Sequence, residues 1–178
     1  MSAEGGTRAV IAALAANLGL AATKFIAYLL TGATAMLAES VHSVADSGNQ
    51  ILLLVGGRRA KREETESHPF GYSRARYYYA FLVAVVLFTV GGLYALYEAW
   101  HKFHNPEPIE AWRWVPLVVL GIGIVLESLS FRTAIRESNR VRGSLGWVAY
   151  IRRSRSPELP VILMEDLAAL VGLVFAFA

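Results

Sequence analysis

Residues 37–50 read LAESVHSVADSGNQ, and they interrupt a run of the chain that is otherwise apolar. Four of the side chains recur at steps of three and four residues: Glu39, His42, Asp46 and Asn49. At about 100° per residue these steps return to one face of an α-helix. An ionisable group in a bilayer costs about 2.5–3.5 kcal/mol on insertion scales, so such groups are presumed functional. The stretch predicts a membrane-crossing helix with one polar face.

The composition supports a membrane class for the whole chain. Of the 178 residues, 55% are hydrophobic and 17% charged, with a mean hydropathy of +0.43. Soluble domains average about 45–50% apolar and about 25% charged residues. Since about 20 apolar residues cross a bilayer, we predict an all-α, polytopic transmembrane bundle occupying residues 1–178, with no soluble domain. The predicted spans are 10–30, 33–55, 77–100, 114–133 and 160–178.

The basic residues predict the orientation of these spans. With the N-terminus inside, 14 of the 17 Lys and Arg residues fall on the inner side, at Arg8 and within 58–76 and 132–155. This asymmetry follows the positive-inside rule. It explains the net charge of +3 without nucleic-acid binding. We expect a multi-pass membrane protein with a cytoplasmic N-terminus, in the plasma (inner) membrane if the protein is bacterial.

The residue types available limit any metal site to oxygen and nitrogen ligands. The chain has no cysteine, so His, Asp, Glu or water must bind the ion. His42 and Asp46 are one helical turn apart, and their side chains can converge on one ion at ligand distances of about 2 Å. The alternative is a hydrogen bond between the two within the helix. The polar residues around them favour a water-lined pathway.

The last apolar run supplies a second pair of candidates, Glu165 and Asp166. Asp166 lies about 9 Å along the helix from Pro160, well into the hydrocarbon. Adjacent helical residues point about 100° apart, so one ion is not expected to use both carboxylates equally. Other polar residues of the apolar runs are interpreted as structural, with Lys24 paired to an acid; Glu127 is one candidate partner.

Several stretches in order make the chain resemble the cation diffusion facilitator (cation efflux, zinc transporter) family. These are residues 37–46, the segment HPFGYSRAR at 68–76, and the segments 90–98 and 165–172. The resemblance implies six membrane helices, a homodimer, a cytosolic C-terminal domain and an ion bound between the second and fifth helices. On this basis the chain lacks the sixth helix and the C-terminal domain.

The same resemblance assigns ligand positions. His42 and Asp46 match the metal-binding pair of the second helix, and Asp166 matches the aspartate of the fifth. The family commonly has another ligand four residues before that aspartate, where this chain has Ile162. Glu165, Glu39 or a water would then complete the coordination. In the loop, Tyr72 stands where some members have a second histidine.

These observations predict a transporter and not an enzyme. The expected activity is proton-coupled efflux of a divalent metal, zinc or a similar transition metal, since imidazole and carboxylate ligands suit such ions. The metal is substrate, and no cofactor is expected. Expected partners are the metal ion, protons, the lipid bilayer and a second copy of the chain. Two alternatives remain: a non-transporting assembly or regulatory module, and a carrier of protons or small solutes.

Overall fold

The computed structural model describes residues 2–32, 34–104 and 114–177. Those residues form helices joined by loops, with one isolated β-bridge between Thr65 and His68. The predicted all-α fold is therefore confirmed. The elements are α1 (Ser2–Thr31), α2 (Thr34–Arg59), α3 (Ala75–Val86), the π-helix η1 (Leu87–Gly92), α4 (Leu93–His104), α5 (Trp114–Arg142), α6 (Trp147–Arg153) and α7 (Glu158–Phe177).

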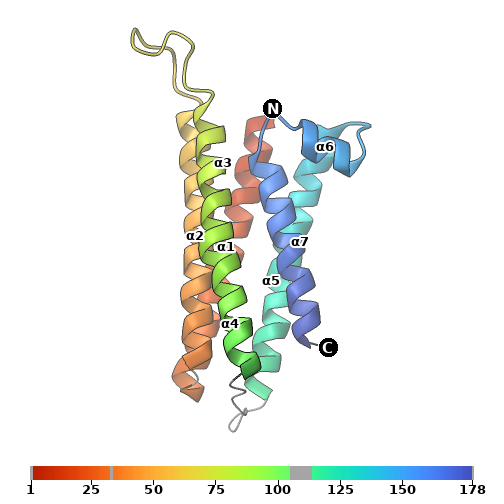
Figure 1. Ribbon diagram of the computed structural model, residues 1–178. Coiled ribbons are helices and arrows are strands. Elements are labelled where there is room, and N and C mark those ends of the chain that lie inside the picture. Colours follow the sequence, from red (N-terminus) through yellow and green to blue (C-terminus); the bar gives the residue numbers. More distant parts are fainter. Residues whose placement is uncertain (1, 33, 105–113, 178) are drawn as a thin grey trace.

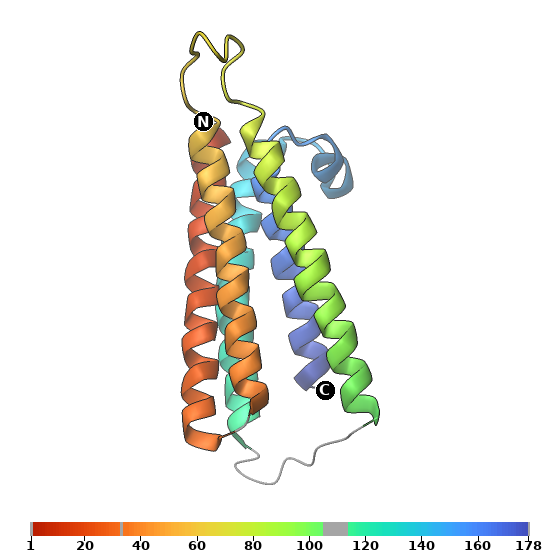
Figure 2. The same ribbon diagram turned by 60° about the vertical axis from the view of Figure 1, so that its left-hand side comes forward.

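The long helices stand side by side as a bundle, while α6 lies beside the end of the bundle that carries the N-terminus (Figures 1 and 2). Helix α1 packs against α2 and α5, α5 packs against α7, and α2 packs against α3. The chain reverses between α1 and α2 at Gly32, whose φ of 69° is left-handed. Its N–H donates to the Tyr28 carbonyl at 2.7 Å. This is a glycine cap that ends a helix, and the chain returns as α2, antiparallel to α1 (Figure 2).

Some helices extend beyond the predicted apolar runs. Helix α5 continues to Arg142, through a basic stretch that was predicted as a polar connection, and α6 forms within the same stretch. A prediction from hydropathy ends the helix where the apolar run ends. The Arg and Glu residues that follow still have high helix propensity, so the helix continues. In this extension Arg140 Nη1 pairs with Glu137 Oε1 at 2.7 Å. The predicted third span is a helix that changes to π geometry at η1.

The bundle is apolar outside and holds polar residues in its interior. Large apolar side chains such as Leu29, Phe88 and Phe175 are 66%, 71% and 79% exposed. The buried polar residues include Asn17, Ser40, Ser43, Ser47, Asn49, Gln50, Glu127, Ser130 and Asp166. Soluble proteins rarely bury Asp or Glu fully, whereas polar groups of membrane helices face the bundle interior. Within the described residues, the segments Gly6–Thr31 and Trp114–Arg142 are long and apolar enough to cross a membrane.

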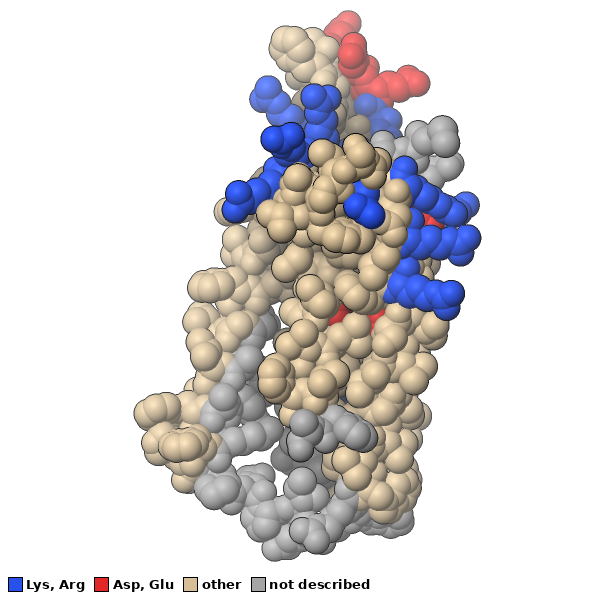
Figure 3. Space-filling model, turned by 90° about the vertical axis from the view of Figure 1, so that its right-hand side faces the viewer, with Lys and Arg blue, Asp and Glu red and all other residues tan. Residues whose placement is uncertain are grey.

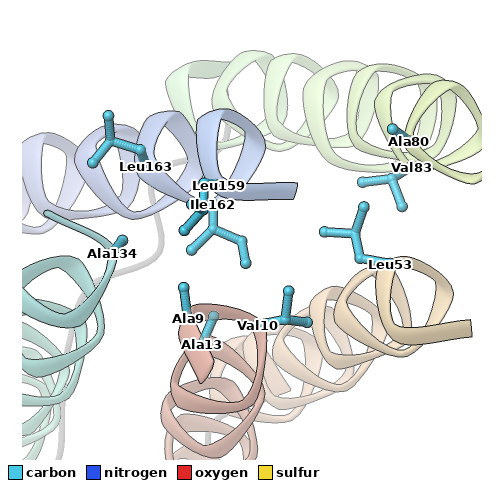
Figure 4. Packing of buried hydrophobic residues seen from close by; sticks show 10 residues of the cluster. All are labelled: Ala9, Val10, Ala13, Leu53, Ala80, Val83, Ala134, Leu159, Ile162 and Leu163. Atoms are coloured by element: carbon cyan, nitrogen blue, oxygen red, sulfur yellow. The ribbon is translucent and has the colours of Figure 1, made fainter. Parts of the chain in front are cut away.

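Two apolar clusters bound this polar interior. The basic-end cluster contains Ala9, Val10, Ala13, Leu53, Ala80, Val83, Ala134, Leu159, Ile162 and Leu163, which converge from five helices (Figure 4). The far-end cluster contains Ala27, Val115 and Val119, with Met36 packed against them. We call the buried and half-buried polar residues between the two clusters the polar layer.

Basic side chains gather at one end of the molecule. Figure 3 shows Lys and Arg, in blue, concentrated at the end that carries α6. The lower part of the face seen in this view shows almost no blue among its tan residues. The last turns of α2, α5 and α6 contribute Arg58, Arg59, Arg140, Arg142, Arg152 and Arg153. The N-terminus lies at the same end (Figure 1). The helices thus bring the basic segments together, as the charge pattern predicted.

Candidate metal site

His42 and Asp46 face each other along α2. Their Nε2 and Oδ2 atoms are 3.6 Å apart, and their side chains are 35% and 22% exposed. A separation of 3.6 Å is longer than a hydrogen bond, so the alternative of a hydrogen-bonded pair within the helix is not formed here. Both side chains therefore keep lone pairs that can face an incoming cation.

The two carboxylates of α7 point to different neighbours. Asp166 is 3% exposed and accepts a hydrogen bond of 2.7 Å from Ser130 Oγ on α5. Glu165 accepts one of 3.0 Å from Gln50 Nε2 on α2. The spacing predicted this divergence, because adjacent helical residues point about 100° apart. Asp166 thus ties α7 to α5, and Glu165 ties α7 to the helix that carries His42.

Electrostatic interactions link these groups across helices. The charge of Glu165 interacts with the charges of Asp46 and Asp166. Glu127, buried on α5, interacts with Asp46 and Asp166 as well. The sequence had suggested only a structural role for Glu127. Its position inside an apolar run was the available signal that it interacts with the candidate carboxylates.

Glu39 forms an ion pair with a cation from another helix. Its Oε2 accepts from Lys24 Nζ on α1 at 2.8 Å, and the same ammonium donates to Ser43 Oγ at 3.2 Å. The predicted pairing of Lys24 with an acid is therefore present, with Glu39 as its hydrogen-bonded partner. The helical face alone could not indicate this, because the ammonium comes from another helix.

The two departures from the family pattern have visible packing consequences. Ile162, one turn before Asp166, is completely buried in the basic-end cluster. This apolar side chain extends the basic-end cluster to within one helical turn of the Asp166 carboxylate. In the α2–α3 loop, the Tyr72 hydroxyl lies 3.0 Å from His68 Nδ1 and the two rings stack at 4.3 Å. That imidazole nitrogen is therefore engaged within the loop.

The candidate ligands do not yet form one coordination sphere. Across the part of the chain that the structure describes, no three His, Asp or Glu side chains converge closely enough to hold a metal ion. His42 and Asp46 lie 3.6 Å apart on α2, while Asp166 on α7 is hydrogen-bonded to Ser130. An ion shared by α2 and α7 therefore requires these helices, or their side chains, to rearrange.

A comparison with protein families identifies this arrangement. The cation efflux transmembrane domain matches residues 10–178. The chain belongs to the cation efflux family. This confirms the resemblance predicted from the sequence, and membership makes the chain a membrane-embedded protein.

The relatives with similar sequences are named as zinc transporters or as a metal tolerance protein. The proton-coupled zinc antiporter SLC30A9, mitochondrial, of Xenopus laevis is 34% identical over 99% of this chain and 32% of its own length. Metal tolerance protein C4 of Arabidopsis thaliana is 31% identical over 96% of this chain and 38% of its own length. Zinc transporter ZitB of Pectobacterium atrosepticum is 28% identical over 71% and 38%, respectively. The chain thus spans about a third of the length of these relatives.

Proposed function

We propose that this chain forms the ion-conducting membrane domain of a proton-coupled exporter of divalent metal ions, with zinc as the favoured substrate. The observation that carries the proposal is the polar layer, in which His42, Asp46, Glu165 and Asp166 lie within an otherwise apolar bundle. Buried ionisable groups in membrane helices mark ion pathways and proton relays. A non-transporting assembly module has no need for them.

In this proposal His42, Asp46 and Asp166 bind the ion, and Glu165 or a water completes its coordination. Imidazole and carboxylate together suit Zn²⁺ and neighbouring transition metals. The names of the relatives, a zinc antiporter and a zinc transporter, support zinc among these. The family also supports transport over enzymatic catalysis. The metal passes through as substrate.

Proton coupling follows from the ligand chemistry. Imidazole and carboxylate groups must lose their protons to bind a metal, so metal and proton compete for the same atoms. Imidazole is also the side chain that changes charge near neutral pH. A proton taken from the far side can therefore displace the ion. The exchange needs no additional cofactor.

Alternating access requires the ends of the bundle to open in turn. The basic-end cluster closes one end with tightly packed apolar side chains, and Val10, Leu53 and Ile162 are each no more than 2% exposed. A hydrated ion cannot cross such a layer without separating it. We propose that rocking of the helices around the site opens this layer and brings α7 toward α2, as in transporters whose site lies near the membrane midplane.

The orientation and assembly of the protein complete the proposal. We place the basic end, with the N-terminus, in the cytoplasm because positive residues favour that side. Metal then enters at the basic end and leaves beyond the α1–α2 turn. We also propose a homodimer, in keeping with the family resemblance.

Metal flux into proteoliposomes tests the proposed function. The purified protein is reconstituted, and Zn²⁺ transport driven by a proton gradient is followed with an enclosed fluorescent indicator. We expect His42→Ala and Asp46→Ala each to lower the flux at least tenfold, since each removes a ligand. His101→Ala is the matched control, because His101 is exposed near the end of α4. Unchanged flux in both site variants would end the proposal, and flux of protons without metal would favour a proton carrier.

A further inference from the structure

Lys24 is a positive charge inside the polar layer that the proposed transport mechanism does not use. It projects from α1, and its side chain is 15% exposed. The ammonium is 2.8 Å from Glu39 Oε2 and 3.2 Å from Ser43 Oγ. An ammonium in a membrane bundle carries a large desolvation penalty unless it is paired. Its ion pair with Glu39 accounts for its burial, and its position in the bundle suggests a further role.

The ammonium lies beside the proposed metal ligands. Ser43, which it contacts, follows His42 directly in the sequence and lies almost one turn before Asp46 on α2. Helical neighbours three residues apart have Cβ atoms about 5–6 Å apart. The charge of Lys24 accordingly interacts with the charge of Asp46, and with that of Glu127 on α5. One cation therefore stands among carboxylates contributed by two other helices.

We propose that Lys24 is a tethered cation that competes electrostatically with the transported metal and thereby sets how tightly the site holds it. This inference rests on the proposed function and adds a residue that the family resemblance did not supply. A divalent ion at His42 and Asp46 is repelled by the nearby ammonium of Lys24. The repulsion weakens binding and favours release of the metal.

The partners of Lys24 lie on the side of Asp46 where the metal leaves in the proposed orientation. Glu39 and Ser43 lie on the side of Asp46 that faces the α1–α2 turn, away from the basic-end cluster. The metal must pass the ammonium on its way out in the proposed orientation. The Glu39 carboxylate can draw the ammonium aside, since the two already form a 2.8 Å ion pair.

A purely structural role for Lys24 predicts the opposite change in metal affinity when the residue is replaced. If the ammonium only held α1 against α2, its removal would loosen the site and weaken metal binding. If it acts as a competing cation, removal strengthens binding. With an effective dielectric constant of about 20, repulsion of a divalent ion by an ammonium beside the site is large enough to change affinity by more than tenfold. Partial neutralisation by Glu39 reduces this, so about tenfold is the expected change.

The experiment measures the Kd for Zn²⁺ of the full protein in detergent, at fixed pH and ionic strength, by competition with a chromophoric chelator. We expect Lys24→Gln to lower the Kd about tenfold and Lys24→Arg to leave it within about twofold of the original protein, by the same Coulomb argument. In proteoliposomes, Lys24→Gln should lower both KM and kcat, because tighter binding slows release. A structural defect would raise KM.

Because the chain has no cysteine, a second variant separates charge from packing. Lys24→Cys provides a unique thiol that an aminoethyl thiosulfonate converts to a cationic side chain and a methyl thiosulfonate to a neutral one, with modification verified by mass spectrometry. Only the cationic label should return the Kd toward its original value. Equal effects of both labels, or weaker binding by Lys24→Gln, would overturn the inference. Asp46→Ala distinguishes this failure from failure of the proposed function, since that variant must lose Zn²⁺ binding if the site itself is correct.

Discussion

Replacement of Ser130 by alanine isolates the contact that orients the α7 carboxylate. Ser130 is 2% exposed, and its hydroxyl donates to Asp166 Oδ2 at 2.7 Å. The substitution removes one oxygen atom and leaves the α5 backbone unchanged. Asp166 then loses the donor that fixes its rotamer in a buried position. If Asp166 binds the metal, its loss of orientation must appear in the metal affinity.

The expected magnitude can be worked out in two ways. A hydrogen bond to a charged group contributes about 1.5–3 kcal/mol, and about 1.4 kcal/mol corresponds to a tenfold change in an equilibrium constant. Groups that hydrogen-bond to metal ligands typically change metal affinity by about 10–100-fold when they are mutated. The two estimates agree, so Ser130→Ala should raise the Kd for Zn²⁺ by about 10–100-fold.

Isothermal titration of Zn²⁺ into the purified protein in detergent measures this change. The matched control is Ser128→Ala, because Ser128 is exposed on the same helix and the chemical change is identical. We expect the control to bind zinc like the original protein. Equal Kd values for Ser130→Ala and the original protein would refute the orienting role of this hydrogen bond. An equal loss in both variants would show an effect on α5 and not on Asp166.

Two further predictions concern stability, each measured as a thermal unfolding midpoint in detergent. Gly56→Ala should destabilise by about 1–3 kcal/mol, because the added Cβ would lie 2.6 Å from Tyr79 Cβ. The matched variant Gly48→Ala, whose added Cβ meets nothing within 4 Å, should stabilise the protein by up to about 1 kcal/mol through helix propensity. If Gly56→Ala and Gly48→Ala unfold at equal midpoints, the close α2–α3 packing is contradicted. Gln50→Leu should cost about 1–3 kcal/mol because the buried Glu165 loses its donor, and an unchanged midpoint would contradict that contact.

Hydropathy and helical periodicity predicted the long apolar helices but not α6, and the reasons are physical. The bilayer sets the length of an apolar run, and the 3.6-residue repeat sets which side chains share a face. The same rules could not predict where α5 ends, because its last turns are held by helix propensity and a Glu137–Arg140 pair. They also could not predict η1, since π geometry depends on how the helix packs.

The candidate site was predictable within each helix and not between helices. The facing of His42 toward Asp46 follows from their spacing, as does the divergence of Glu165 and Asp166. The partners of these carboxylates, Ser130 and Gln50, come from other helices, and their contacts depend on helix rotation. The sequence of one helix does not predict how that helix is rotated relative to its neighbours.

The location of a bound ion tests the central claim most directly. The protein is crystallised or imaged with Zn²⁺, and the metal is identified by anomalous scattering. Ligand distances should be about 2.0–2.2 Å to His42 Nε2 and to carboxylate oxygens of Asp46 and Asp166, with α2 and α7 drawn together. A specifically bound zinc that leaves either helix without a ligand, or that lies outside the polar layer, would contradict the account.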